Sequence, residues 1–348
     1  MKKKSKQPVA VDLFSGCGGL TQGLRDAGFV VGAAVEIDSL AGETYAANHP
    51  GVKLFNHDIR TLSTSKVMDA CGIGVGELDL LAGCPPCQGF SRLINNNKRD
   101  RMDDPRNRLI DEVLRLVGEM QPKVVMLENV PNLSRYTRYA DFKRGLRKLG
   151  YQISDQVLDV ADFGVPQRRR RLVVLASRLG RISHISPTGK RMTVRDAIGK
   201  LPNRIVRNDP LHNLEERHSE RIRELIRAIP KNGGSRTSLS PELALKCHER
   251  HDGFFDVYGR MSWDEVAPTI TGGCINPSKG RFLHPTEDRA ITLREAAILQ
   301  SFPASYSFSL RRGTYAAAEM IGNALPPAFS RMQAEAIKIH LSKQAACS

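Results

Sequence analysis

Residues 11–20 read VDLFSGCGGL and place a short apolar segment directly before Gly16, Gly18 and Gly19. Glycine permits positive φ and lets the backbone approach a ligand closely, while the N-terminus of a following helix offers free N–H groups. Thr21 stands where the dinucleotide fingerprint G-x-G-x-x-G requires its third glycine. The segment predicts a strand, a turn and a helix, and by itself it is a weak signal for a nucleotide ligand.

The same alternation of apolar and amphipathic segments continues over about the first 180 residues. The apolar runs are rich in Val and Leu without polar alternation, which indicates strands buried on both faces. Such a chain predicts an open, doubly wound α/β domain with a mostly parallel sheet, whose ligands bind at the carboxyl ends of the strands. The expected strands are VAVDLF (9–14), VVGAAVE (30–36), LDLLA (78–82), KVVMLE (123–128) and RLVVLAS (171–177). The expected helices are 20–28, 109–120 and 140–150.

The composition changes between about residues 185 and 255, where apolar runs disappear and Arg, His, Asn and Pro become frequent. HSERIRELIRAI (218–229) has helical spacing, and we expect an inserted lobe that exposes positive charge. The alternative is a solvated irregular segment without contacts. The predicted division is a first domain over residues 1–184, a smaller lobe over 185–290, and a hinge with a C-terminal return to the first domain over 291–348.

The whole chain of 348 residues carries 52 Lys and Arg against 37 Asp and Glu, a formal net charge of +15. Such an excess attracts polyanions, so nucleic acid is the first partner to consider, although a merely soluble basic protein has the same composition. We expect neither a membrane span nor a signal peptide, because the apolar runs are short. Seven cysteines in an irregular pattern do not indicate a disulfide framework, so a cytoplasmic protein is expected. Cys84 and Cys87 lack a second ligand pair, and we expect no metal.

Two acidic residues strengthen the nucleotide signal. Glu36 ends the second expected strand, where a carboxylate can accept both hydroxyls of a ribose. Asp58 follows the segment KLFNH (53–57) and is placed to meet an adenine amino group. The alternative for each acid is a helix cap or an ordinary surface charge.

The segment AGCPPCQGFSRLI (82–94) follows the expected strand 78–82. Pro85 and Pro86 restrict the backbone just before Cys87, and Gly89 restores backbone freedom just after it. This arrangement presents the Cys87 side chain at the carboxyl end of a strand. A cysteine is a useful nucleophile only as the thiolate, which requires an electropositive site. The alternative is an inert buried cysteine.

Two further segments carry charged groups to strand ends. In LENVPN (127–132), Glu128 and Asn129 end an apolar strand, so Glu128 either caps a helix or is a poised acid. In FGVPQRRRRLVVLAS (163–177), four arginines enter a strand, and alternate members must point to opposite faces. We expect Arg169 and Arg171 to share one face and Arg168 and Arg170 the other, so that one pair can serve a site while the other stays in solvent.

Taken together, these segments resemble the cytosine-C5 DNA methyltransferase family, in that family's usual, unpermuted order. The resemblance covers nearly the whole chain except residues 185–255, where the family keeps its variable target-recognition region. The matching segments are FSGCGG (14–19), Glu36, Asp58, PPCQGFS (85–91), ENV (128–130), the Q-x-R-x-R of Gln167, Arg169 and Arg171, RMSWDEVAPTIT (260–271) and GNALPP (322–327).

The resemblance implies a covalent reaction on cytosine. Cys87 would add to C6, which turns the ring into an enamine that can attack a methyl donor through C5. Glu128 would hold and protonate N3, Arg169 would bind the O2 side, and Arg171 would support the pocket electrostatically. The sequence does not identify the base that removes the C5 proton.

The implied methyl donor is S-adenosylmethionine, which is consumed. The donor would lie along the glycine turn, with Glu36 on the ribose and Asp58 on the adenine. Asn323 and Ala324, from the far end of the chain, would close the pocket. The full set of expected donor-binding residues is Phe14, Ser15, Gly16, Cys17, Gly18, Gly19, Leu20, Glu36, Ile37, Asp58, Ile59, Pro86, Leu109, Asn323 and Ala324.

The implied partner is double-stranded DNA, from which the target cytosine must be flipped out. The polar segment from Ser91 to about Arg108 suits a flap that closes over the flipped base, and its alternative is a disordered surface loop. The recognised sequence would be read by the 185–290 lobe. The resemblance also allows a cognate restriction endonuclease that acts on the same site, and a monomer suffices for the mechanism.

Three other functions compete with this interpretation. A tRNA cytosine-C5 methyltransferase uses the same chemistry, but the Cys-Phe-Thr signature of that relative is absent from this sequence. A DNA-binding protein without catalysis is disfavoured by the intact Cys87, Glu128 and Arg169. A nicotinamide-dependent oxidoreductase is disfavoured by Thr21 and by the large basic lobe.

Overall fold

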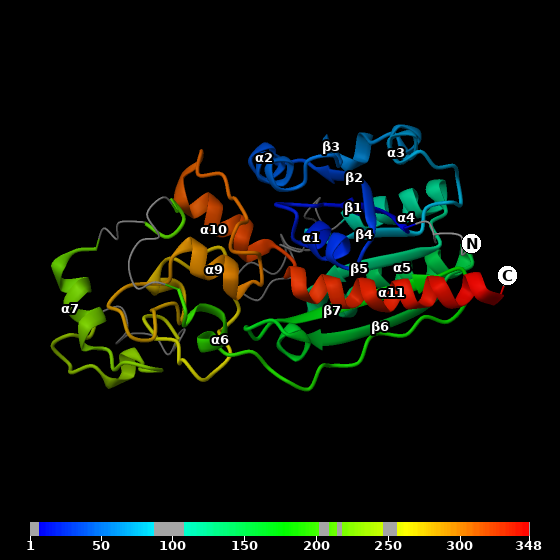
Figure 1. The fold of residues 1–348 in the computed structure, drawn as a ribbon. Coiled ribbons are helices and arrows are strands. Elements are labelled where there is room, and N and C mark those ends of the chain that lie inside the picture. The colour runs from blue at the N-terminus through cyan, green and yellow to red at the C-terminus, as the bar shows by residue number, and fades with distance from the viewer. Residues whose placement is uncertain (1–6, 87–107, 202–208, 214–217, 246–255, 348) are drawn as a thin grey trace. The chain divides into compact units, whose positions relative to one another are not determined.

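The protein is described here from a computed structural model that covers residues 7–86, 108–201, 209–213, 218–245 and 256–347 (Figure 1). The chain forms two compact units. The first unit comprises Met1–Asp159, Arg170–Pro187 and Leu325–Ser348, and the second comprises Val160–Arg169 and Thr188–Ala324. The expected boundary at residue 184 lies close to Pro187. Residues 291–324, which we expected in the C-terminal return, belong to the second unit.

The first unit is built on one seven-stranded sheet in the order β3-β2-β1-β4-β5-β7-β6. All neighbouring pairs from β3 to β5 are parallel, and β7 runs antiparallel to both of its neighbours. The mostly parallel, doubly wound sheet predicted from the sequence is therefore confirmed. The strands are β1 (Val9–Leu13), β2 (Val30–Glu36), β3 (Lys53–Asn56), β4 (Leu80–Gly83), β5 (Val124–Asn129), β6 (Gln152–Asp159) and β7 (Arg170–Ser177).

Two features of the sheet depart from the sequence analysis. The edge strands β3 and β6 were not among the expected strands, because edge strands need no continuous apolar run; β6 exposes several of its residues. The apolar pattern of β7 suggested a parallel strand, but β7 is antiparallel. β7 lies inside the sheet, between β5 and the edge strand β6, and most of its residues are buried. The same burial would result for either strand direction, so the apolar pattern could not distinguish the two directions.

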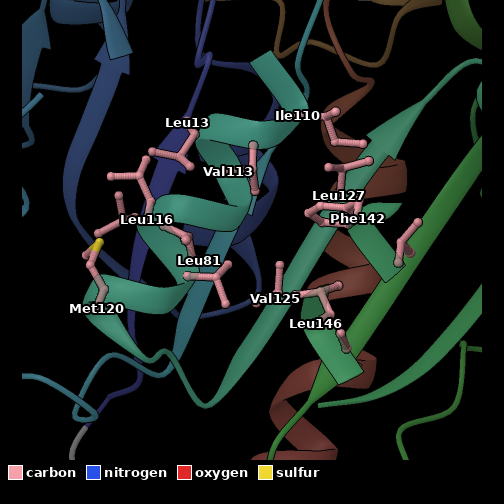
Figure 2. Close-up of a cluster of buried hydrophobic side chains, with 14 of the residues drawn as sticks. Leu13, Leu81, Ile110, Val113, Leu116, Met120, Val125, Leu127, Phe142 and Leu146 are labelled. Atoms are coloured by element: carbon pink, nitrogen blue, oxygen red, sulfur yellow. The ribbon is translucent and has the colours of Figure 1, made fainter. Parts of the chain in front are cut away.

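Helices cover both faces of this sheet. The helices of the first unit are α1 (Gly19–Asp26), α2 (Ser39–Asn48), η1 (Ile59–Thr61), α3 (Thr64–Cys71), α4 (Leu109–Met120), η4 (Pro131–Arg135), α5 (Thr137–Lys148) and α11 (Pro327–Cys347). Figure 2 shows the core on one face, where side chains of α4 and α5 pack against strand residues such as Leu13, Leu81 and Val125. Because side chains alternate along a strand, Asp12 points to the opposite face from Leu13.

The C-terminal helix α11 lies against α1 and the end of β7. The Ser330 Oγ lies 3.3 Å from the Gly19 carbonyl oxygen, and the Ser177 Oγ lies 2.8 Å from the His340 Nε2. A Cβ at Gly23 would lie 2.5 Å from the Pro327 carbonyl oxygen, so only glycine permits this close approach of α1 and α11. The last helix of the chain thereby supports the helix that follows the glycine turn.

The second unit consists of short helices joined by irregular segments and isolated bridges. Its helices are η5 (Val160–Phe163), α6 (Val194–Ile198), α7 (Glu220–Ala228), η6 (Arg236–Ser238), η7 (Pro277–Lys279), α9 (Leu293–Leu299) and α10 (Gly313–Asn323). α7 falls within the segment 218–229 that was predicted to be helical. None of the helices in the described parts of the chain is long and apolar enough to cross a membrane.

A fully buried arginine organises the part of the second unit around α7. The Arg260 guanidinium donates to the carbonyl oxygens of Ile226 at 2.8 Å, Ile229 at 3.1 Å and His284 at 2.9 Å. It also donates to the Glu287 carbonyl and, at 2.5 Å, to the Asp288 carboxylate. All five N–H groups of the side chain are thus used. These bonds tie the end of α7 to the segment 284–288.

Arg260→Leu is expected to destabilise the second unit by about 3–5 kcal/mol, because it leaves several buried carbonyl groups without a donor. The matched control is Arg227→Ala on α7, which removes a solvent-exposed ion pair with Glu220 and is expected to change stability by no more than about 1 kcal/mol. Denaturant unfolding and limited proteolysis near α7 measure both effects. Equal stability of Arg260→Leu and the wild type would contradict the role of Arg260.

Candidate active site

The order of the strands in the sheet indicates a site at the carboxyl ends of the strands in the first unit. β2 and β3 lie on one side of β1, whereas β4 and β5 lie on the other, so the order reverses between β1 and β4. In open α/β sheets such a switch point opens a crevice at the carboxyl ends of the strands. The turn after β1 and the segment after β4 both leave the sheet there. Gly16 after β1, Glu36 at the end of β2 and Glu128 near the end of β5 all lie at these carboxyl ends, where the sequence predicted them.

The glycine turn after β1 has an unusual backbone. Phe14, Gly16 and Gly18 all have positive φ, at 57°, 53° and 97°. For Phe14, which has a Cβ, this conformation is strained and needs support from the surroundings. That support includes a bond from the Ser15 N–H to the Val35 carbonyl at 3.0 Å and one from the Gly18 N–H to the Ser15 carbonyl at 2.9 Å. Leu20 is buried in the first turn of α1.

Glu36 holds the turn from the side of β2. Its Oε2 accepts the Gly16 N–H at 2.7 Å and its Oε1 accepts the Asp38 N–H at 2.8 Å. Burial raises the pKa of Glu36 above its ordinary value, while these two bonds oppose the rise. The neighbouring Ile37 exposes 65% of its surface, which is unusual for such an apolar side chain. A carboxylate beside an exposed apolar side chain suits a nucleoside, which presents hydroxyls and an aromatic base.

Asp58 is already engaged in the structure. Its carboxylate accepts both the Nε of Arg60, at 3.0 Å, and the Nη2, at 2.6 Å. Hydrogen bonding to Arg60 keeps the pKa of Asp58 below its ordinary value. Asp58 also caps η1, in which Ile59 is buried, so the helix-cap alternative considered for this acid does occur. A role toward an adenine would require Asp58 to share its oxygens with Arg60.

The segment after β4 is attached to the end of β5. The Asn129 side chain donates its Nδ2–H to the Pro85 carbonyl at 3.0 Å, within the buried interior. Pro86 is the last described residue before a gap, and Cys87 lies outside the described residues, as does most of the expected flap from Ser91 to about Arg108. The predicted nucleophile therefore follows directly on a segment that a buried hydrogen bond holds at the site.

Among the described residues, the thiols of Cys17 and Cys84 at this end of the sheet are unsuited to act as nucleophiles. Burial raises the pKa of Cys17 to about 12. Burial, and then the neighbouring Glu128 carboxylate, raise the pKa of Cys84 well above its ordinary value. Because only the thiolate reacts, both thiols are inert near neutral pH.

Glu128 and Arg171 form an ion pair at the end of β5. The Arg171 Nε lies 2.7 Å from the Glu128 Oε1, and the two side chains are 15% and 9% exposed. The antiparallel register places Glu128 opposite Val173, so the start of β7 lies beside the carboxyl end of β5. Although Arg171 is near the beginning of its strand, it therefore reaches the same edge as Glu128. An ion pair this deeply buried fixes the position of the Glu128 carboxylate at the end of β5.

Arg169 lies in the second unit. Its Nη1 donates to the carbonyl oxygens of Ile270 at 3.0 Å and Gly322 at 2.8 Å, and the side chain is buried. Along the arginine run, Arg168 and Arg170 are exposed while Arg169 is buried, in agreement with the expected alternation. The common face with Arg171 was inferred from a continuous strand, but β7 begins only at Arg170. Arg169 therefore precedes the strand, and the two carbonyl groups to which it donates belong to the second unit as well.

Three further expected donor-binding residues, which come from later in the chain, lie at the ends of helices. Leu109 begins α4 and packs partly against the core of the first unit. Asn323 ends α10 and is exposed, and Ala324 caps that helix, both in the second unit. Their contact with a donor stays a prediction. Among the described residues, no group of three or more His, Cys, Asp or Glu is arranged to hold a metal ion.

Sequence reasoning missed a buried acid beneath the glycine turn. Asp12 is fully buried, and its Oδ2 accepts the Thr21 hydroxyl at 2.7 Å. Burial raises the pKa of Asp12 to about 7, the Thr21 bond opposes the rise, and the nearby Glu36 adds to it. The available signal was a single carboxylate inside the apolar run VAVDLF, and Thr21, noted only as a departure from a glycine fingerprint, is the partner of that carboxylate.

Asp12 makes a testable contribution to the pH dependence of stability. Its pKa in the folded protein lies above the value of about 3.9 in an unfolded chain, so folding favours the protonated form. The resulting stabilisation is present below about pH 4 and is lost as the pH rises toward 7. Asp12→Asn cannot ionise, so the Tm of the variant minus that of the wild type is expected to increase between pH 5 and pH 8. A Tm difference that is independent of pH would contradict the raised pKa.

Comparison with known proteins identifies relatives over the full length. The C-5 cytosine-specific DNA methylase family matches residues 9–339. The type II methylase M.HgiDII of Herpetosiphon aurantiacus is 36% identical over 95% of both chains, and the type II methyltransferase M1.HphI of Haemophilus parahaemolyticus is 35% identical over 94% of this chain and 86% of its own.

Solved structures agree with the fold. A DNA modification methyltransferase encoded within an E. coli prophage superposes with a TM-score of 0.71 at 27% identity, covering 97% of this chain and all of that one. S. pombe Dnmt2 methyltransferase has the same fold, with a TM-score of 0.63 at 20% identity over 96% of this chain and 99% of its own.

Proposed function

This chain belongs to the C-5 cytosine-specific DNA methylase family, and from that premise we propose which of its residues carry out methylation of cytosine C5 in duplex DNA. The observation that carries the proposal is the buried Glu128–Arg171 ion pair. It lies at the carboxyl ends of the strands, as do the glycine turn and the segment that leads into Cys87. A proton donor, a nucleophile and a donor-binding turn are the three components that the reaction requires.

S-adenosylmethionine supplies the methyl group when it is bound. The glycine turn fits such a ligand, because its backbone comes close to the space above β1 and Glu36 offers carboxylate oxygens for a ribose. The exposed Ile37 provides an apolar surface for the adenine. Phe14, which directly follows β1, and Pro86, in the segment after β4, would line the same pocket.

The chain's own residues would act in sequence on the flipped cytosine. The Cys87 thiolate adds to C6 and forms a carbon–sulfur bond, while Glu128, after taking up a proton from solvent, passes that proton to N3, which makes C5 nucleophilic. Arg171 holds the Glu128 carboxylate in place, and Arg169 contacts the O2 side of the ring. After methyl transfer a base takes the C5 proton, Cys87 leaves C6 as thiolate, and N3 returns its proton to Glu128, which restores the enzyme.

The second unit would bind and read the DNA. Its position in the chain corresponds to the region where the resemblance places target recognition, and the whole chain carries a net charge of +15. We propose that the protein acts as a monomer in the cytoplasm, without a metal. Because several relatives are named as type II methylases, we further propose a restriction-modification role with a cognate endonuclease for the same site.

Transfer of radiolabelled methyl from S-adenosylmethionine to duplex DNA tests the activity directly. The expected product is 5-methylcytosine in DNA, with no label in tRNA. Bisulfite sequencing of DNA from cells that express the gene then identifies the target sequence. Label recovered only in RNA would favour the tRNA methyltransferase instead, and label in neither would reject the proposed function.

The affinity for DNA is expected to depend steeply on salt. Neutralisation of phosphates by Lys and Arg releases counterions, so an interface with six or more phosphate contacts loses on the order of 10³-fold in affinity between 50 and 200 mM salt. Fluorescence anisotropy with a labelled duplex measures this slope. A flat salt dependence would argue against an interface dominated by phosphate contacts.

A further inference from the structure

A continuous set of buried polar contacts lies beneath the glycine turn and joins β1, α1 and α2. Thr21 donates to Asp12 at 2.7 Å, and the Thr21 Oγ1 lies 2.8 Å from the Tyr45 hydroxyl. With Asp12 ionised, the Tyr45 hydroxyl must be the donor to Thr21, because the Thr21 proton is already directed to the carboxylate. All three side chains are fully buried. Polar groups this deep are retained at a considerable desolvation cost, which calls for a role.

The same set continues to the backbone of the turn through His49. The His49 ring packs against Tyr45, with ring centroids 4.8 Å apart. The His49 Nε2 lies 3.2 Å from the Gly18 carbonyl oxygen, and the Arg25 Nη1 lies 3.1 Å from the Nδ1. Arginine only donates and a carbonyl only accepts, so Nε2 carries the proton and Nδ1 is the acceptor. Burial, with the nearby Arg25 charge, lowers the pKa of His49 to about 4, which keeps the ring in this neutral form.

These contacts hold the turn from below, opposite Glu36. Gly18 is the N-cap of α1 and has a φ of 97°, and no side chain caps the helix there. Its carbonyl also accepts the first helical bond, from the Gln22 N–H at 2.8 Å. Thr21 lies in the first turn of the same helix. The turn is therefore anchored at Gly16 by Glu36 and at Gly18 by His49, so a shift at Gly18 would displace the surface that faces the ligand.

We propose that Thr21 and His49 are positioning residues, which hold the glycine turn in the conformation that accepts the methyl donor. Asp12 and Arg25 in turn fix the orientation of these two side chains. The other ionisable groups that face Asp12 are Glu36 from β2, Cys17 from the turn and Cys84 from the end of β4. The inference rests on the proposed binding of S-adenosylmethionine at this turn.

Two pairs of variants test the proposal. Thr21→Val removes the hydroxyl at nearly constant volume, whereas Thr21→Ser keeps it. His49→Leu removes the donor to Gly18, whereas His49→Gln keeps an N–H group that can reach a carbonyl. Gln22→Ala, which removes only a side-chain hydrogen bond to Asp26 on α1, is the control. The measurement is the Kd for S-adenosylhomocysteine by calorimetry on the full chain, a probe that requires neither DNA nor Cys87, together with kcat at saturating donor and the Tm.

Thr21→Val and His49→Leu are expected to raise the Kd for S-adenosylhomocysteine by about tenfold. Their kcat at saturating donor should stay within about twofold of the wild type. Thr21→Ser, His49→Gln and the control should stay within about threefold of the wild-type Kd. The proposal is overturned if the Val and Leu variants bind the probe as tightly as the wild type. It is equally overturned if the Ser and Gln variants lose as much affinity, because the hydrogen bonds would then be irrelevant. If Thr21→Val does not fold, the His49 pair decides. A wild type that fails to bind the probe would instead reject the donor site itself.

Discussion

Cys87→Ala is expected to abolish methyl transfer to DNA, with a loss on the order of 10⁴-fold or more in kcat. Cytosine C5 is too poor a nucleophile to attack a methyl donor unaided, and the addition of a thiolate at C6 is what activates it. Among the described residues, the thiols of Cys17 and Cys84 are unsuited to substitute, since burial raises the pKa of both. Transfer of radiolabelled methyl at saturating donor and DNA measures the effect.

The control for this variant is Cys71→Ala. Cys71 ends α3, away from the carboxyl edge of the sheet, and burial raises the pKa of its thiol to about 11. Its replacement is expected to leave activity within about twofold of the wild type. A duplex that contains 5-fluorocytosine adds a direct test. Release of Cys87 requires removal of a proton from C5, and a fluorine atom at C5 cannot be removed in this way, so the covalent adduct is trapped. The wild type should form a covalent complex that survives denaturing electrophoresis, and Cys87→Ala should not. Equal methylation by the two proteins would refute the covalent mechanism.

Glu128→Gln is expected to lower kcat by about 10²- to 10⁴-fold, the usual contribution of a positioned proton donor. The amide keeps the shape of the side chain but cannot transfer a proton to N3, and it leaves Arg171 without the carboxylate that lies 2.7 Å away. Single-turnover methylation measures the chemical step. The Kd for S-adenosylhomocysteine should be unchanged, because Glu128 lies at the end of β5 and not in the glycine turn.

Glu112→Gln is the matched control for Glu128→Gln. Glu112 also forms an ion pair at 2.7 Å with an arginine, Arg115, but on the surface of α4. The Glu112 and Arg115 side chains are 25% and 33% exposed, so solvent still screens the pair and it contributes little; activity and stability should both stay close to the wild type. If Glu128→Gln retains wild-type kcat, Glu128 is not the proton donor. If Glu112→Gln is equally impaired, the loss reflects the removal of an ion pair in general.

The strands in the middle of the sheet could be predicted from the sequence, whereas its edges could not. Runs such as VVGAAVE are uniformly apolar because both faces of the strand are covered, and that signal is local. β6 lacks it, because an edge strand remains partly in solvent. The direction of β7 was also invisible, since burial is the same for either orientation. Direction depends on the connection through β6, which is a property of the tertiary fold.

The candidate site shows the same division. The glycine turn, Glu36 and Glu128 were predicted because each directly follows or ends an apolar run, and a strand end is a local feature. The pairing of Glu128 with Arg171 could not be predicted in the same way. It requires β7 to run antiparallel to β5, so that the beginning of one strand lies beside the end of the other.

Local sequence patterns were enough to predict the residue types proposed for the reaction, their order along the chain and their places at strand ends, because apolar run length and glycine turns are encoded within a few neighbouring residues. The tertiary structure alone decided which of these groups meet and in what environment. Asp12 and Thr21 illustrate the reason: one is an acid in an apolar run and the other a departure from a fingerprint. Only the packing of α1 and α2 on β1 removes water from both, joins them by a hydrogen bond and raises the pKa of Asp12 to about 7.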